Sequence, residues 1–134
     1  MRSVLAVVAG FLVMAVIVMI GTAVAARVIL RQPLSTIRTG SSEPLPLEYL
    51  AANLSASAIA ALCGGFLTAA IAGRSPLAHG LALAVVMVLM SILSMKQAGA
   101  SQPRWYQLTL ATAMPALALT GAFIRAMLTP VPGP

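Results

Sequence analysis

Four long apolar stretches dominate this chain and limit the folds that it can adopt. They cover residues 4–26, 49–72, 77–95 and 105–128, and no Asp, Glu, Lys or Arg lies near the middle of any of them. A bilayer core of about 30 Å requires roughly 20 apolar residues in a helix, so each stretch is long enough to cross a membrane. We therefore predict an all-α integral membrane bundle of four transmembrane helices, with residues 1–134 forming a single transmembrane domain.

The composition agrees with this prediction. The chain is 60% hydrophobic and only 7% charged, whereas about a quarter of the residues of a soluble domain are charged. Lys and Arg outnumber Asp and Glu by eight to two, but these basic residues lie at the ends of the apolar stretches, where they meet lipid head groups. No run of basic and aromatic residues is suited to follow a phosphate backbone. The expected partners include membrane lipids and exclude nucleic acid.

The segments between the apolar stretches contain turn-forming residues. Residues 32–47 are polar and rich in proline, which predicts the main extramembrane loop. The sequence Gly73-Arg74-Ser75-Pro76 combines a helix stop, a cap and a helix start, which predicts a tight hairpin between the second and third helices. Glu48 follows Pro46 and is expected to stabilise the positive end of the second helix. An ion-binding or catalytic carboxylate is the alternative for Glu48.

The first apolar stretch also has features of a secretory signal peptide, because Ala23-Val24-Ala25 matches an A-x-A cleavage site. The stretch is longer than the roughly 7 to 15 apolar residues of a usual signal peptide. We therefore favour a transmembrane helix.

The orientation of the bundle depends on the residues at each side of the membrane. An even number of crossings places three basic residues on the side of the termini and five on the side of the long loop, so a literal positive-inside count puts the termini outside. We expect the opposite orientation, with both termini cytoplasmic in a bacterial inner membrane, because a very short basic N-terminal tail commonly stays cytoplasmic. Aromatic and acidic residues also gather on the long-loop side. The residues expected to anchor that side at the membrane interface are Arg31, Tyr49, Arg104, Trp105 and Tyr106.

Small residues recur every four positions along the second stretch. In lipid, faces of this kind allow two helix backbones to approach closely, and the contact holds the helices together. The predicted helix-packing interface comprises Ser57, Ala61, Gly64, Gly65, Ala69 and Gly73.

The single histidine, His79, lies about one turn into the third helix, next to small residues that leave space for a flat ring. Neutral imidazole ligates metals, so His79 is the candidate ligand for haem iron or chlorophyll magnesium. A hydrogen-bonding role without any cofactor is the alternative. The methionines and Cys63 have soft sulfur ligands suited to Cu(I), but gap filling explains the methionines better. No spacing predicts a metal site or a catalytic set, and we expect no enzymatic activity.

The segment GGFLTAAIAGR, Gly64 to Arg74, followed by a proline turn and later by Pro103-Arg104-Trp105-Tyr106, resembles small four-helix bacterial inner-membrane proteins that are mostly uncharacterised. The resemblance implies a fold and a location, and no function. The chain also has the size of small multidrug-resistance transporters. It lacks the acidic residue in the first helix that those transporters use to exchange protons for drug.

The expected function is that of an accessory subunit of a larger membrane complex, one of electron transfer for example, that packs against other integral membrane subunits through its small-residue face. This expectation rests on the uncharged middles of the helices, because proton pumps and ion-coupled transporters need ionisable groups there. One alternative is a pigment- or haem-binding subunit that uses His79. The other is a small transporter with a polar cavity, whose candidate lining residues are Asn53, Thr68, Ser91, Ser94 and Thr112.

Overall fold

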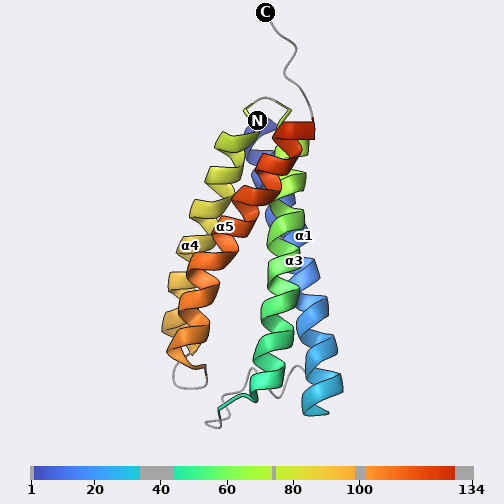
Figure 1. Cartoon of the computed structure of the whole chain (residues 1–134), viewed down its shortest axis with the longest axis vertical. Helices are drawn as coiled ribbons and strands as arrows, with labels where there is room; N and C mark the ends of the chain where they lie inside the picture. The colour runs from blue at the N-terminus through green and yellow to red at the C-terminus, as the bar shows by residue number, and fades with distance from the viewer. Residues whose placement is uncertain (1, 34–43, 74, 99–101, 129–134) are drawn as a thin grey trace, which may run out of the picture.

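The structure is a computed structural model that describes residues 2–33, 44–73, 75–98 and 102–128. Its helices are α1 (Arg2–Ala25), α3 (Leu47–Ala72), α4 (Pro76–Ala98) and α5 (Arg104–Leu128), and α1 continues into the π-helical turn η1 (Ala26–Leu30) (Figure 1). Within the described residues there are four helices long and apolar enough to cross a membrane. The prediction of an all-α bundle is confirmed, and the protein is an integral membrane protein.

The helix boundaries lie close to the predicted ones and have local causes. Gly73, with a φ of 67°, adopts a left-handed conformation that ends α3. The carbonyl group of Ser75 accepts the first backbone hydrogen bonds of α4, and that of Pro103 does the same for α5. Glu48 lies exposed in the first turn of α3, as expected. Of the predicted loop, residues 34–43 lie outside the described residues.

The first membrane helix is longer than predicted, because η1 extends it to Leu30. The turn ends at Arg31, which has a φ of 52°, and the backbone N–H of Gln32 donates to the carbonyl oxygen of Ala26 at 3.3 Å. This wider turn keeps Ala25 and Ala26 buried against α3 and α5.

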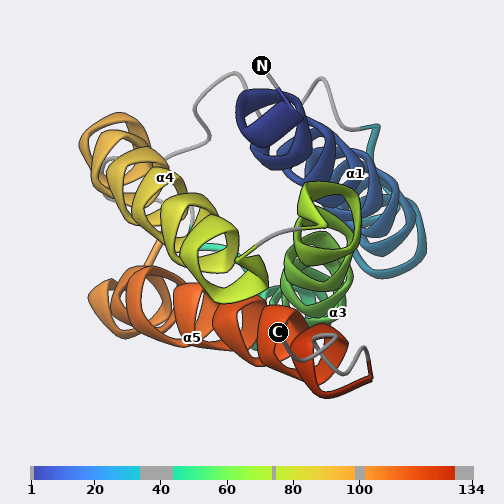
Figure 2. The ribbon, with the colours of Figure 1, turned by 90° about the horizontal axis from the view of Figure 1, so that it is seen from above.

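The four helices run up and down, so that the start of α1 and the end of α5 lie at the same end of the bundle (Figure 1). We call this the termini end, and we call the opposite end, where η1 stops and α3 and α5 begin, the loop end. Seen along the bundle, α3 lies between α1 and α5, and α5 lies beside α4 (Figure 2). The helices α1 and α4 also touch, but over a shorter length than the other neighbouring pairs.

Glycine contacts hold the helices together in the half toward the termini end. A methyl group on Gly65 of α3 would overlap the backbone carbonyl of Ala118 in α5, and one on Gly64 would come within 3.1 Å of the carbonyl oxygen of Gly10 in α1. A methyl group on Gly80 of α4 would lie 2.5 Å from the Cβ of Ala122 in α5. In this half the backbones touch because side chains are absent from the contacts.

Larger side chains separate the helices in the half toward the loop end. There the pair α4 and α5 diverges from the pair α1 and α3 (Figure 1). Tyr49 and Tyr106, which are 3% and 2% exposed, fill part of the space together with Ala25, Ala26 and Leu50. Both tyrosines were expected to anchor the membrane interface, and in the bundle their side chains pack against neighbouring helices.

Candidate functional site

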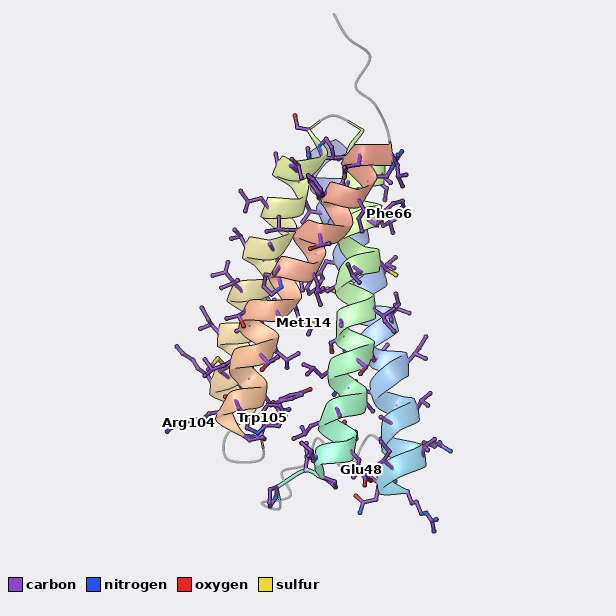
Figure 3. The ribbon with its side chains drawn as sticks, in the orientation of Figure 1. Glu48, Phe66, Arg104, Trp105 and Met114 are labelled. Atoms are coloured by element: carbon purple, nitrogen blue, oxygen red, sulfur yellow. The ribbon has the colours of Figure 1, made fainter. Side chains whose placement is uncertain are left out.

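A cavity of about 710 Å³ occupies the half of the bundle toward the loop end. Residues from all four membrane helices line it, and it spans Phe11 to Met19 on α1 and Met87 to Met95 on α4. Toward the termini end, a buried cluster that includes Leu83, Met87 and Met114 closes the bundle, and Met114 lies between the helix pairs (Figure 3). The volume falls within the range of about 300 to 1,000 Å³ that is typical of small-molecule sites.

Methionines form much of the apolar lining. Six of the eight methionines of the chain line this cavity. Methionine side chains are flexible and polarisable, so they adapt to ligands of irregular shape and make favourable contacts with aromatic rings. The six are Met14, Met19, Met87, Met90, Met95 and Met114.

The polar lining residues are all uncharged. They come from α3, α4 and α5 and from the connection that precedes α5, and none of the described lining residues is an Asp, Glu, Lys, Arg or His. A charged ligand would enter this part of the membrane without a counter-charge, at a free-energy cost on the order of 3 kcal/mol or more. The cavity is therefore suited to a neutral molecule. The polar residues are Asn53, Ser57, Ser91, Ser94, Gln102, Tyr106 and Gln107.

Hydrogen bonds orient the Asn53 side chain. The hydroxyl of Thr22 on α1 donates to Asn53 Oδ1 at 3.3 Å, and the hydroxyl of Ser57 donates to the same oxygen at 3.5 Å. The NH₂ group of Asn53 donates to the hydroxyl oxygen of Tyr49, one turn earlier on α3. Asn53 therefore links α1 to α3 through its oxygen and retains one N–H without a partner.

Gln107 carries a second amide into the lining. The residue is only 8% exposed, and it makes no side-chain hydrogen bond within the described part of the chain. Its position in the first turn of α5 is fixed by its backbone N–H, which donates to the carbonyl oxygen of Pro103 at 3.3 Å.

Three of the five residues expected to line a polar cavity do so, namely Asn53, Ser91 and Ser94. The expectation is wrong for the other two. Thr68 is fully buried against Gly10 in the α1–α3 contact, and Thr112 is exposed, with its hydroxyl donating to the Leu108 carbonyl oxygen at 2.8 Å.

The sequence analysis missed Gln107 and the methionines as cavity residues, although a spacing signal was present. Met87, Met90, Ser91 and Ser94 recur at intervals of three and four residues, which places them on one face of α4. Gln107 and Met114 are seven residues apart and share a face of α5 in the same way. Periodicity alone does not distinguish a cavity-lining face from a core face.

His79 lies at the termini end, far along α4 from the cavity. Its Nδ1 donates to the carbonyl oxygen of Ser75 at 3.0 Å, since a carbonyl group only accepts. His79 lines neither this cavity nor a smaller hollow between α1, α3 and α5. The described residues contain no group of three or more His, Cys, Asp or Glu side chains placed to hold a metal ion. Haem or chlorophyll ligation by His79 has no further support from the surroundings of the ring.

The small-residue face of α3 packs against the other helices of this chain. Ser57, Ala61, Gly64, Gly65 and Ala69 are all buried. The prediction is wrong for Gly73, which is exposed and would have nothing within 4 Å of an added methyl group. Gly73 terminates a helix and does not contribute to packing.

The remaining anchor residues are exposed at the loop end. Arg104 and Trp105 begin α5, and Arg31 follows η1 (Figure 3). The Trp105 ring lies edge-on to that of Tyr106, with a centroid distance of 5.9 Å. The only tryptophan of the chain is therefore next to a cavity-lining side chain.

A second hollow of about 550 Å³ lies between α1, α3 and α5. Its lining includes Val13, Phe66 and Ile124, and among its described lining residues the thiol of Cys63 is the only polar side-chain group. Phe66 points away from the first cavity, toward the outside of the bundle (Figure 3). This surface offers nothing to orient a polar ligand.

Comparison of the chain with protein-family models, with curated proteins and with solved structures finds no match.

Proposed function

We propose that this membrane protein binds a neutral, mainly apolar molecule in the cavity between its helix pairs. The observation that supports the proposal is a cavity of about 710 Å³ whose lining combines six methionines with uncharged polar groups. An apolar site with a few convergent polar groups is the usual form of a small-molecule site. The protein then acts by holding the molecule, without catalysis.

A small molecule fits the cavity better than a helix of another subunit. A helix that spans the bilayer is about 30 Å long and 10 Å wide, whereas the cavity ends at Phe11, Met87 and Met114, about halfway along the bundle. Beyond that level the glycine contacts of α3 with α1 and α5 close the interior. A spanning helix has no continuous path through it.

Binding is also the first step of transport, which was the alternative expected from the sequence. Among its described residues, the lining provides no Asp, Glu, Lys, Arg or His to couple movement of the ligand to protons. If the protein releases its ligand on the other side, the movement follows the gradient of that ligand. Passive storage or presentation of the ligand requires no such step.

Membership of a larger membrane complex stays a prediction. The small-residue face that was expected to contact a partner is filled by α1 and α5, so a partner would have to contact the outer faces of the bundle. The proposed location is a bacterial inner membrane with both termini cytoplasmic.

The test compares two phenylalanine variants of α4 after purification in mild detergent. Ser91→Phe fills the cavity, whereas Ala82→Phe adds the same ring to an exposed position on the same helix. Native mass spectrometry should detect a bound small molecule on the wild type and on Ala82→Phe, and much less on Ser91→Phe. Equal amounts on all three proteins, or none on the wild type, would contradict the proposal. The same preparation reveals any protein subunit that co-purifies.

A further inference from the structure

Two amide side chains from different helices line the cavity and have unused hydrogen-bonding groups. Asn53 comes from α3 and Gln107 from α5. The oxygen of Asn53 already accepts from Thr22 and Ser57, and its NH₂ group donates to Tyr49, so one N–H of Asn53 is left without a partner. Gln107 has both of its groups free among the described residues. The cavity therefore offers more donors than acceptors from these two residues.

Gln107 is 8% exposed as a residue, and its side-chain amide opens onto the cavity without a hydrogen-bond partner among the described residues. An amide that opens onto a cavity is available to a bound molecule. Methionine and leucine side chains nearby provide no hydrogen bond of comparable strength. A bound molecule with a hydrogen-bond acceptor supplies the partner that the Gln107 amide lacks.

We propose that Asn53 and Gln107 together recognise a carbonyl oxygen on a neutral long-chain molecule. This inference rests on the proposed function and specifies the class of ligand. A carbonyl oxygen has two lone pairs and accepts from both NH₂ groups. A quinone and an ester lipid both supply such an oxygen, joined to an apolar chain.

The positions of the polar and apolar lining residues determine how the ligand lies in the cavity. Asn53, Gln102 and Gln107 lie toward the loop end, whereas Phe11, Met87 and Met114 lie near the middle of the bundle. The carbonyl head therefore lies toward the loop end, close to the membrane interface, and the chain extends among the methionines.

The experiment uses two probes of equal length, the methyl ketone tridecanone and the alkane tridecane. Each is titrated into the protein in lipid nanodiscs, and thermal unfolding is followed by the fluorescence of Trp105, the only tryptophan. A ligand that binds the folded state raises the unfolding temperature, and the rise grows with the logarithm of its affinity. A net hydrogen bond of about 0.5–1.5 kcal/mol should make the ketone bind about two- to tenfold more tightly than the alkane.

The matched variants are Gln107→Met, which keeps the size of the side chain and removes the amide, and Thr112→Val, which removes an outward-facing hydroxyl from the same helix. The preference for the ketone should disappear in Gln107→Met and persist in Thr112→Val. Should Gln107→Met fail to fold, the comparison of the two probes on the wild type still decides the question.

The outcomes separate the two proposals. Equal binding of ketone and alkane to the wild type would overturn the carbonyl inference, because water would then satisfy Gln107, and would leave the binding function intact. Binding of neither probe would overturn both. Titration with a decyl-substituted benzoquinone and with a monoacylglycerol distinguishes the two carbonyl sources, since the natural class should stabilise the protein at the lower concentration.

Discussion

The backbone carbonyl of Ala118 in α5 lies directly against the Cα of Gly65 in α3, with no room for a methyl group between them. One helical turn further along α5, Gly121 approaches the carbonyl of Leu62 in the same way. These two contacts fix the point at which α3 and α5 cross. From there the helices separate toward the loop end, and the cavity occupies part of the space that their separation creates.

Because α3 and α5 cross at these contacts, alanine substitutions at two neighbouring glycines should lower the free energy of unfolding by different amounts. Gly65→Ala forces α3 away from α5 and should lower the free energy of unfolding by about 2 kcal/mol, the usual cost of overpacking. Gly64→Ala meets its nearest atom, the Gly10 carbonyl oxygen, at 3.1 Å and should cost less. Unfolding titrations in mixed micelles measure both values. Equal stability of the two variants would mean that the crossing does not depend on Gly65.

The hydrogen bond between Thr22 and Asn53 predicts a measurable coupling between α1 and α3. The Thr22 hydroxyl donates to Asn53 Oδ1 at 3.3 Å in a partly buried position. Hydrogen bonds between membrane helices contribute about 0.6 kcal/mol on average. A double-mutant cycle with Thr22→Val and Asn53→Ala should give a coupling free energy of about this size. Strictly additive effects would show that the two side chains act independently.

The surroundings of His79 predict that it binds no visible cofactor. Its Nδ1 is held by the Ser75 carbonyl oxygen at 3.0 Å, and neither cavity described above includes it. His79→Leu should therefore leave the visible absorption spectrum of the purified protein unchanged. A haem or chlorophyll band in the wild type that is lost in His79→Leu would support the cofactor-binding alternative.

The proposed orientation is open to a labelling test. Because Cys63 is the only cysteine, the background variant is Cys63→Ala. Ser75→Cys then reports the termini end, and Gln32→Cys reports the loop end, since both residues are exposed. A maleimide that does not cross the inner membrane, added to spheroplasts, should label Gln32→Cys and spare Ser75→Cys. The reverse pattern would place both termini outside the cytoplasm.

The amino-acid sequence determined the helices themselves. The apolar stretches and the residues at their ends, such as Glu48, Gly73 and Pro76, predicted all four membrane helices to within a few residues, apart from the extension of the first helix through η1. The reason is that a bilayer imposes a fixed length and demands internally paired backbones. These constraints act on each segment separately, so each membrane helix can be recognised from its own stretch of sequence.

The tertiary structure alone decided which faces meet and where the interior stays open. The small residues of α3 predicted close packing, yet only the folded bundle shows that Gly64 faces α1 and that Gly65 faces α5. In the same way, a polar residue on a membrane helix can face lipid, as Thr112 does, or the cavity, as Gln107 does. The physical reason is that packing in lipid depends on the relative rotation and crossing of helices distant in sequence, and these are set jointly by many weak contacts.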